Sequence, residues 1–369
     1  MSPFLMRMLI SNLWGLRTGD WIGLLRRHRF AVERRYFGRA LFQTAYSAAN
    51  SCLAAYESAR HGAAIRNAAV PPPLFILGHW RSGTTHLHNL LARDPQFVAP
   101  TLHQAFFPRT FLTTQHWLPP LCRWLLPPTR MIDNMKLSPD TPWEDEFALN
   151  LLTVGLSPLM GWTWPREAAA YDRYLTMRDA SEAERTRWSD ALRWFAAKLH
   201  VASGRIPVFK SPQHTGRTWL LRQIFPGARF LHIHRHPEQV FQSTRVMLRH
   251  GTVMACLQRP REDDVDGRVL ATYRTLHDSY FRDAPQIPAA QLVEIGFAEL
   301  LADPLATLRH AYDRLGIDGF AEAEPRMRAF LDRNRDYRSN EHEPLAAEER
   351  RRLADVAEPA AARWGYSFQ

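Results

Sequence analysis

Short runs of apolar residues alternate with longer stretches at helical spacing along the chain after Pro73. Four of the runs have the length of buried strands and read LFILG, IPVFK, RFLHIHR and QLVEIGF, at residues 74–78, 206–210, 229–235 and 291–297. The stretches at helical spacing cover residues 84–92, 183–201, 218–224, 237–249 and 304–315. Strands that alternate with helices pair in parallel, so the pattern predicts an α/β fold with a central parallel sheet flanked by helices. Ligands of such folds bind at the carboxyl ends of the strands.

The segment before this pattern is different, because it has helical spacing and dense arginine but no strand-like run. It contains RRHRFAVERR at residues 26–35, and HGAAIRNAAVPPP at residues 61–73 is typical of a linker. We therefore expect a helical N-terminal extension over residues 1–65 and one larger domain over residues 66–369. The pattern of residues 1–16 favours an amphipathic helix, either packed on the body of the protein or lying at a membrane surface.

One stretch, residues 147–165, carries no charge over 19 residues, which is near the length of a membrane span. Asn150, Gly155, Pro158 and Gly161 interrupt it, and it lies inside what the pattern indicates is one globular domain. We predict a buried helix followed by a turn that lines a pocket.

Composition adds a preference for anionic partners. The net charge is +10, and 46% hydrophobic and 23% charged residues are typical of a soluble globular protein. Only three of the 47 cationic residues are lysines, at positions 136, 198 and 210, so a lysine inside a motif needs a specific explanation. Three distant cysteines indicate neither a disulfide framework nor a metal site. Together with the lack of a clear signal peptide, they favour a cytoplasmic protein.

The first motif is the polar loop that follows the run at residues 74–78. Gly83 and its neighbours bridge a strand to a helix start, where glycine lets backbone N–H groups turn toward an anion and the helix dipole adds positive charge. Ser82, Thr84 and Thr85 supply hydroxyl donors, and Arg81 supplies a guanidinium. A Walker loop would have Gly-Lys-Ser/Thr here, so the anion differs from the β/γ-phosphates of ATP; an ordinary capped turn is the alternative.

The second motif, VFKSPQHT at residues 208–215, places Lys210 at the end of a strand. In a chain that otherwise uses arginine, a lysine here indicates a compact, mobile ammonium that can follow a moving oxygen. A lysine that only neutralises the end of a sheet is the alternative.

The third motif is ARFLHIHRHPEQVFQST at residues 228–244. Its strand ends at Arg235, Pro237 opens a helix, and Ser243 lies about two turns into that helix, where arginine and serine could converge on one phosphate.

The three motifs together resemble the sulfotransferases that use 3′-phosphoadenosine-5′-phosphosulfate (PAPS). The resemblance runs from Leu74 to Ser243 and continues in VEIGFAELLADPLATLRHAYDRLGI at residues 293–317. It is strongest toward the branch that includes the tyrosylprotein sulfotransferases and many bacterial enzymes. It implies a P-loop-like sulfotransferase fold over residues 66–369.

The resemblance also implies roles for residues. Arg81, Ser82, Gly83, Thr84 and Thr85 would bind the 5′-phosphosulfate of PAPS, the co-substrate, and Arg235 and Ser243 would bind its 3′-phosphate. Lys210 would lie beside the transferring sulfuryl group. Arg338 and Ser339 lie where related enzymes close a loop over the nucleotide. A phosphosulfate is handled without a metal, which agrees with the lack of a Mg²⁺-binding carboxylate at a strand end.

An in-line attack by an alcohol on sulfur requires a general base. The tyrosylprotein branch has a glutamate about twenty residues after the loop, whereas this chain has His103 and Gln104 there. Glu144 and Glu146 in DTPWEDEFAL are alternatives, although Thr141, Pro142 and Glu144 also have the pattern of a helix capping box. The base is Glu144, Glu146, His103 or another group such as His214.

The acceptor is not specified by the motifs. A hydroxyl, or an amine, on a small molecule, lipid or glycan is expected, and twelve tryptophans with the uncharged stretch favour a hydrophobic acceptor. No nucleic-acid partner is expected, and the N-terminal segment is a candidate for peripheral membrane contact. Two other functions stay open: a P-loop kinase or nucleotide hydrolase, which would need a loop lysine and a Mg²⁺ ligand, and a basic membrane or nucleic-acid binder without catalysis.

Overall fold

The computed structural model describes residues 11–123, 126, 129, 137–260, 264–335 and 344–368, with the backbone alone for residues 250–254. The chain forms two compact units that interleave along the sequence. Unit 1 comprises Met1–Val70, Pro100–Gly204 and Leu248–Asp263, and unit 2 comprises Pro71–Ala99, Arg205–Met247 and Asp264–Gln369. The domain boundary expected after residue 65 stays a prediction.

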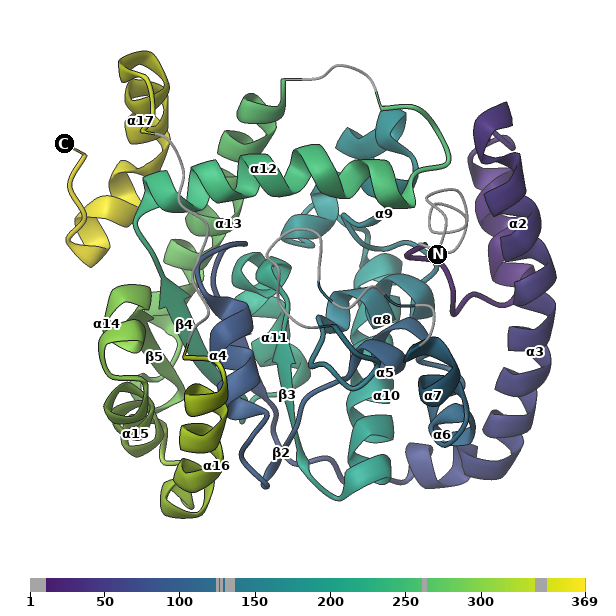
Figure 1. Cartoon of the computed structure of the whole chain (residues 1–369), viewed down its shortest axis with the longest axis horizontal. Coiled ribbons are helices and arrows are strands. Elements are labelled where there is room, and N and C mark those ends of the chain that lie inside the picture. The colour runs from purple at the N-terminus through teal and green to yellow at the C-terminus, as the bar shows by residue number, and fades with distance from the viewer. Residues whose placement is uncertain are drawn as a thin grey trace. The chain divides into compact units, whose positions relative to one another are not determined.

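Unit 2 contains a five-stranded sheet of order β2-β3-β1-β4-β5, in which every pair of neighbours is parallel. The strands are β1 (Leu74–Leu77), β2 (Phe97–Val98), β3 (Ile206–Lys210), β4 (Arg229–His234) and β5 (Leu292–Gly296). The predicted parallel sheet is confirmed (Figure 1). Because β1 lies between β3 and β4, the loops that follow these three strands leave the sheet side by side.

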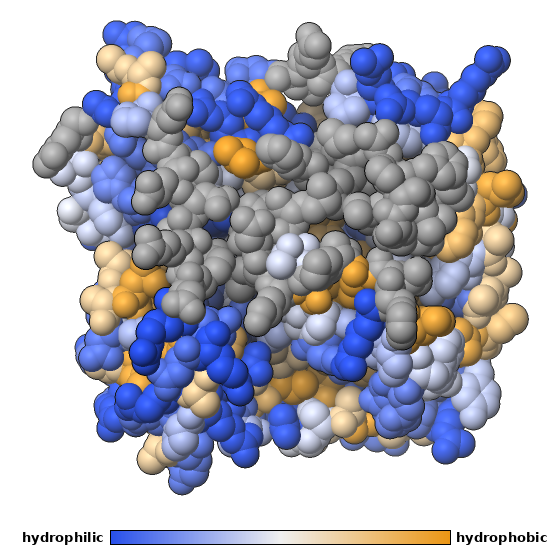
Figure 2. Space-filling view, in the orientation of Figure 1, coloured by the Kyte–Doolittle hydropathy of each residue, from blue (hydrophilic) through white to orange (hydrophobic). Residues whose placement is uncertain are grey.

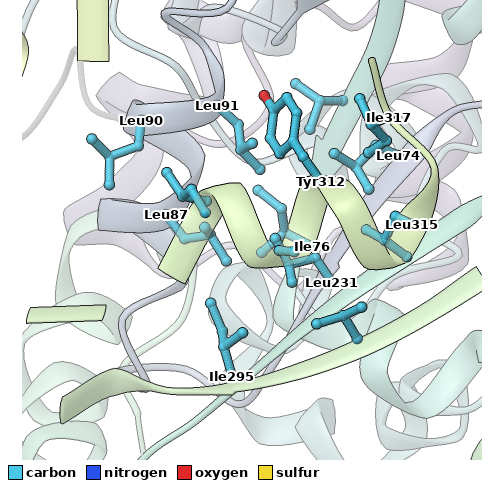
Figure 3. Close-up of a cluster of buried hydrophobic side chains, with 14 of the residues drawn as sticks. Leu74, Ile76, Leu87, Leu90, Leu91, Leu231, Ile295, Tyr312, Leu315 and Ile317 are labelled. Carbon is cyan, nitrogen blue, oxygen red and sulfur yellow. The ribbon is translucent and has the colours of Figure 1, made fainter. Parts of the chain in front are cut away.

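One face of the sheet is covered by helices whose apolar side chains share a buried cluster with alternate strand residues. Leu74 and Ile76 of β1 belong to it, together with Leu87 and Tyr312 (Figure 3). The helices on this face are α4 (Thr84–Leu91), α14 (Phe297–Ala302), α15 (Pro304–Leu315) and α16 (Phe320–Arg333). Alternate residues of a strand point to opposite faces, so the intervening side chains form a second layer.

The opposite face carries aromatic side chains from three strands. The ring centroid of Phe75 lies 5.5 Å from that of Phe209 and 5.8 Å from that of Phe230. The helices on this side are η3 (Pro212–Arg217), α11 (Thr218–Ile224) and α13 (Val265–Asp283), and the predicted helix over residues 218–224 is confirmed. Unit 2 also contains α17 (Ala347–Trp364), the short helices η4 (Ala284–Gln286) and η5 (Ala289–Gln291), and most of α12 (Pro237–Ala255).

The described part of unit 1 is built from helices. They are α2 (Thr18–Arg27), η1 (Arg34–Tyr36), α3 (Phe37–Arg66), α5 (Leu102–Phe106), α6 (Phe111–Thr114), α7 (Leu118–Arg123), α8 (Asp145–Leu152), α9 (Met160–Thr163), η2 (Pro165–Leu175) and α10 (Glu182–Ser203). Within residues 11–65, the expected helical character is confirmed by α2 and α3. The helix expected at residues 1–16 falls largely outside the described residues, and residues 12–15 form a turn.

The start of α8 corrects one expectation. The predicted capping box of Thr141 and Glu144 is wrong, because α8 begins at Asp145 with Glu144 as its N-cap and no side-chain cap hydrogen bond. The Thr141 hydroxyl instead accepts a hydrogen bond of 2.9 Å from the backbone N–H of Ser138 and closes a turn before the helix. The uncharged stretch after it is divided between α8, a turn and α9, and no described helix is long and apolar enough to cross a membrane.

Candidate active site

The loop between β1 and α4 has a backbone that only a few residue types adopt easily. Gly78 has φ 142° and Gly83 has φ 102°, and both lie in the region that favours glycine. A Cβ atom on Gly78 would lie 2.5 Å from the carbonyl oxygen of Ile233, and one on Gly83 would lie 2.2 Å from the Phe297 ring. Both glycines are therefore required by the close approach of neighbouring chain as well as by the turn.

Arg81 has a left-handed backbone as well, with φ 68°, and its side chain connects two of the predicted motifs. Its Nε donates a hydrogen bond of 2.8 Å to Oγ of Ser243, and its carbonyl oxygen accepts one of 3.2 Å from Nη1 of Arg235. A non-glycine residue in this conformation is uncommon and frequently marks a functional site. The structure thus brings together Arg81, Arg235 and Ser243.

Lys210 lies at the carboxyl end of β3, next to Ile76 in the sheet register. Its Nζ is 3.5 Å from Oγ1 of Thr85 in the first turn of α4, so the second motif also reaches the loop. Lys210 is almost fully buried. Its ammonium and the guanidinium of Arg81 therefore both belong to the region around the start of α4.

The loop residues differ in what they offer a ligand. Both the backbone N–H and the hydroxyl of Ser82 donate to the carbonyl oxygen of His79, at 3.2 and 2.7 Å, so Ser82 shapes the turn in this structure. Gly83, Thr84 and Thr85 stand at the N-terminus of α4, where the first N–H groups have no acceptor within the helix. These groups with Arg81 and Lys210 form a set of donors suited to an anion.

The neighbouring histidines are held neutral, so the positive charge comes from arginine and lysine. Burial lowers the pKa of His79 to about 4, and its Nδ1 donates to the carbonyl oxygen of Trp80 at 2.9 Å. Burial likewise lowers the pKa of His234, beside Arg235, to about 4. In the described residues, no group of three or more His, Cys, Asp or Glu side chains is placed to hold a metal ion.

The candidate bases belong to different units. His103, in α5 of unit 1, donates from Nε2 to Oγ1 of Thr114 at 2.9 Å, because that hydroxyl itself donates to Thr110. Burial lowers the pKa of His103 to about 4, with a smaller opposing effect of Asp140 and a supporting one of Lys198. These features make His103 a weak base at neutral pH.

Glu146 is fully buried in α8, and its Oε1 accepts a hydrogen bond of 2.6 Å from the Ser157 hydroxyl. Glu144 is half-buried, and its side chain does not cap α8. His214 is the candidate that lies in unit 2; it is buried in η3, with its ring edge-on to Phe75 at 5.4 Å.

Three groups near the loop were not identified from the sequence. The Phe297 ring lies 4.6 Å below the guanidinium of Arg235, Gln239 accepts from Nε of the same arginine at 2.8 Å, and Thr215 accepts from the backbone N–H of Gly78 at 2.8 Å. Gln239 and Thr215 lie inside the third and second motifs, so their place in these motifs could have identified them as site residues. Phe297 also lies in a quoted segment, at the end of the run at residues 291–297, but its position under Arg235 depends on packing between β4 and β5 and could not be read from that run. Arg338 and Ser339 lie outside the described residues.

The fold agrees with the comparison to protein families. The model of a sulfotransferase family matches residues 72–322, which include all three motifs. The chain belongs to the sulfotransferase family.

Two curated relatives carry the same protein name. The omega-hydroxy-beta-dihydromenaquinone-9 sulfotransferases Stf3 of Mycobacterium bovis and Mycobacterium tuberculosis are each 32% identical to this chain over 358 residues, which is 96% of this chain and 92% of theirs.

Solved structures show the same fold. Sulfotransferase STF9 from Mycobacterium avium has a TM-score of 0.72 at 18% identity, covering 96% of this chain and 98% of its own. Sulfotransferase STF1 from Mycobacterium tuberculosis H37Rv has a TM-score of 0.63 at 17% identity, covering 92% of both chains. The family match and the two curated relatives confirm the sulfotransferase interpretation over the kinase and the non-catalytic binder.

Proposed function

We propose that this enzyme transfers the sulfuryl group of PAPS to a hydroxyl of a hydrophobic, lipid-like acceptor and releases 3′-phosphoadenosine-5′-phosphate (PAP). The observation that carries the proposal is the convergence of Arg81, Arg235 and Ser243 across two strand ends, beside the helix N-terminus that follows the loop. A donor with phosphate groups at two ends needs one set of hydrogen-bond donors at the loop and a second set beside it, and Arg235 with Ser243 would supply the second. A nucleotide with phosphates only at its 5′ end would have no use for the second set.

Each part of the site has a proposed role. The loop residues Arg81–Thr85 bind the 5′ end of the nucleotide, with Ser82 acting through the shape of the turn. Arg235 and Ser243 bind the 3′-phosphate, and Arg338 and Ser339 are proposed to close over the nucleotide. PAPS supplies an activated sulfuryl group, and no metal is needed. Lys210 neutralises charge on the leaving oxygen, a kind of stabilisation worth about 10²–10³ in rate.

Thermal stability with three ligands tests the donor. A ligand at 100 times its Kd should add about 2.7 kcal/mol to the free energy of unfolding, which raises the melting temperature. We expect PAP to stabilise strongly and ADP weakly. If ATP with magnesium stabilises instead and PAP has no effect, the proposed donor is wrong.

A matched pair of variants tests the 3′-phosphate site. Arg235→Ala should weaken PAP binding by about 10–100-fold, the cost of one charge-assisted hydrogen bond, and leave AMP binding unchanged. Arg229→Ala is the control, because Arg229 begins the same strand and donates to the carbonyl oxygen of Leu315 at 2.8 Å. It should leave the preference for PAP over AMP intact.

The general base is proposed among Glu144, Glu146 and His103. Glu144 is the first candidate to test, because its side chain is only half-buried whereas that of Glu146 is fully buried, and because burial lowers the pKa of His103 to about 4. Loss of a general base typically lowers the rate by about 10²–10⁴. Glu144→Gln should therefore lower kcat by this factor without changing PAP affinity, measured with labelled PAPS and the acceptor recovered from cell extract. If His103→Asn lowers kcat by this factor and Glu144→Gln does not, His103 is the general base.

The lipid-like acceptor is supported by the Stf3 relatives, whose name specifies a hydroxylated dihydromenaquinone. A surface of unit 1 supports it as well. Phe30, Phe37 and Leu41 expose 60%, 56% and 73% of their area, beside the exposed Arg34 and Arg35, and orange and tan side chains appear over α2 and α3 (Figure 2). Apolar side chains flanked by arginine are suited to the surface of an anionic membrane.

Sedimentation with lipid vesicles tests this contact. The protein should sediment with phosphatidylglycerol vesicles and less with phosphatidylcholine vesicles. Leu41→Ser should reduce binding, whereas Leu301→Ser, which removes a leucine of 54% exposure in α14 of unit 2, should not. Equal behaviour of the two variants would contradict the membrane contact.

A further inference from the structure

The residues on either side of Arg235 are held by the C-terminal end of the chain. Nδ1 of His234 and the Tyr366 hydroxyl lie 2.8 Å apart in a hydrogen bond. Nε2 of His236 donates to the carbonyl oxygen of Ser367 at 3.1 Å, and the His236 and Tyr366 rings meet edge to face at 5.3 Å. Side chains alternate along an extended backbone, so His234 and His236 point away from the side on which Arg235 reaches Arg81.

The same C-terminal segment is anchored to the sheet. Trp364, the last residue of α17, stacks on His234 with ring centroids 4.7 Å apart and planes 1° from parallel. Arg363 donates from Nη2 to Glu294 of β5 at 2.7 Å, and Trp364 donates from Nε1 to the same carboxylate at 3.3 Å. The register pairs Glu294 with His232, so this anchor lies on β5 beside β4, the strand that ends directly before Arg235.

The start of α17 is tied to the helix that carries Ser243. Arg350 forms an ion pair of 2.9 Å with Glu238 in the first turn of α12, and Glu349 accepts from Arg245 at 2.6 Å. Arg245 stands two residues after Ser243 in α12. We name the residues Glu349, Arg350, Tyr366 and Ser367 the C-terminal clasp.

We infer that the C-terminal clasp positions Arg235 and Ser243 for recognition of a 3′-phosphate, with Tyr366 as the main positioning residue. The arginine follows directly after the end of β4, where the backbone is no longer held by the sheet, and the clasp replaces that support from the opposite side. Tyr366 acts through its contacts with His234 and His236. The inference rests on the proposed PAPS site, which makes the preference for PAP over AMP the relevant quantity.

The test compares affinities for PAP and AMP, which differ only in the 3′-phosphate. In the full chain, Tyr366→Ala should lower the ratio of PAP affinity to AMP affinity about tenfold and leave AMP affinity unchanged. A misplaced Arg235 would lose only part of the free energy of its charge-assisted hydrogen bond to the 3′-phosphate. Tyr366→Phe keeps the ring but loses the hydroxyl, so it should give a smaller loss in the same direction.

Tyr312→Phe is the matched control. It removes another tyrosine hydroxyl from unit 2, one that donates to Asp94 at 2.6 Å. Tyr312 packs on the face of the sheet covered by α4, α14, α15 and α16, rather than at the end of β4. It should lower the melting temperature without changing the PAP to AMP ratio. An unchanged ratio in Tyr366→Ala, with or without a lower melting temperature, would show that the clasp is merely structural and would overturn the inference.

A double-mutant cycle shows whether Tyr366 acts through Arg235. In the Arg235→Ala background, Tyr366→Ala should have no further effect on PAP affinity, because the group that it positions is gone. An equal additional loss in that background would overturn the inference. If the wild-type protein has no preference for PAP over AMP, the proposed donor and this inference both fail; if that preference is present and survives in Tyr366→Ala, only the inference fails.

Discussion

Arg81 combines a strained backbone with a side chain that spans two motifs. An L-residue in the left-handed region costs roughly 1–2 kcal/mol relative to the right-handed one, and glycine avoids this cost. The arginine is held there by its hydrogen bond to Ser243 and by the one that its carbonyl oxygen accepts from Arg235. We interpret the strained backbone of Arg81 as the consequence of placing a guanidinium at this position of the loop, where glycine would fit without strain.

Arg81→Gly separates stability from binding. Relief of strain offsets the lost hydrogen bond, so we expect the free energy of unfolding to change by less than about 1 kcal/mol. PAP affinity should fall about 10–100-fold, because a charge-assisted contact is lost. Denaturant unfolding and PAP titration measure the two effects. Arg29→Gly relieves the same strain at an exposed arginine with φ 50° and should leave PAP affinity unchanged.

At the scale of elements, a buried ion pair connects α3 and α10 in unit 1. Lys198, one of the three lysines of the chain, donates to Glu57 and to the carbonyl oxygen of Pro108, and its Nζ lies 4.1 Å from the Phe111 ring centroid. The other carboxylate oxygen of Glu57 accepts from the backbone N–H of Thr113 at 2.7 Å. Burial lowers the pKa of Lys198 to about 8, although Glu57 opposes the shift.

Lys198→Met should destabilise the protein by about 3–5 kcal/mol, because it leaves the Glu57 carboxylate buried without its cation. The double variant Lys198→Met with Glu57→Leu removes both charges and should recover much of that loss. Urea unfolding of the three proteins measures it. A double variant that is no more stable than Lys198→Met would contradict an electrostatic explanation and indicate a packing defect.

At the scale of the whole chain, several histidines are buried in the neutral form. Burial lowers the pKa of His79 to about 4 and that of His277 to about 3, and the two rings stack 5.9 Å apart. An unfolded histidine has a pKa near 6.5, so between pH 6.5 and 4 the unfolded chain binds protons that the folded chain does not. The contribution of these two neutral histidines to the free energy of unfolding is fully present above pH 6.5 and is lost as the pH falls toward 3.

We therefore expect the free energy of unfolding to fall below pH 6.5 by about 1.4 kcal/mol per pH unit for each such histidine. His277→Asn keeps a side-chain donor for the carbonyl oxygen of Tyr273 but cannot titrate, so it should make the decline less steep. His116→Asn, at an exposed histidine, should not change the slope. Urea unfolding at a series of pH values provides the comparison, and equal slopes in the two variants would contradict the assignment.

The hydrophobic pattern by itself determined four of the five strands of unit 2 and the helices α4, α11, α12 and α15, but not α13, α14, α16 or α17. The strand at residues 206–210 and the helix at residues 304–315 lie where it predicted them, because a period of two or of 3.6 is a local property of the chain. The motif residues were also identified locally, since each follows a strand. The strand β2, of two residues, was too short to give a pattern, and Thr141 was misread because a turn competes with a helix cap for its hydroxyl.

Only the tertiary structure decided which of these residues meet. Arg81 and Ser243 lie 162 positions apart, and their hydrogen bond depends on β1 and β4 being neighbours in the sheet. The Phe297 ring under Arg235 and the hydrogen bond of Tyr366 to His234 depend in the same way on the packing of β5 and α17 against β4. Composition and periodicity specify the type of each element, whereas contacts between distant residues arise from how the elements pack. The sequence therefore identified Arg81, Arg235 and Ser243 as candidates, and the order of the strands in the sheet brought these three together.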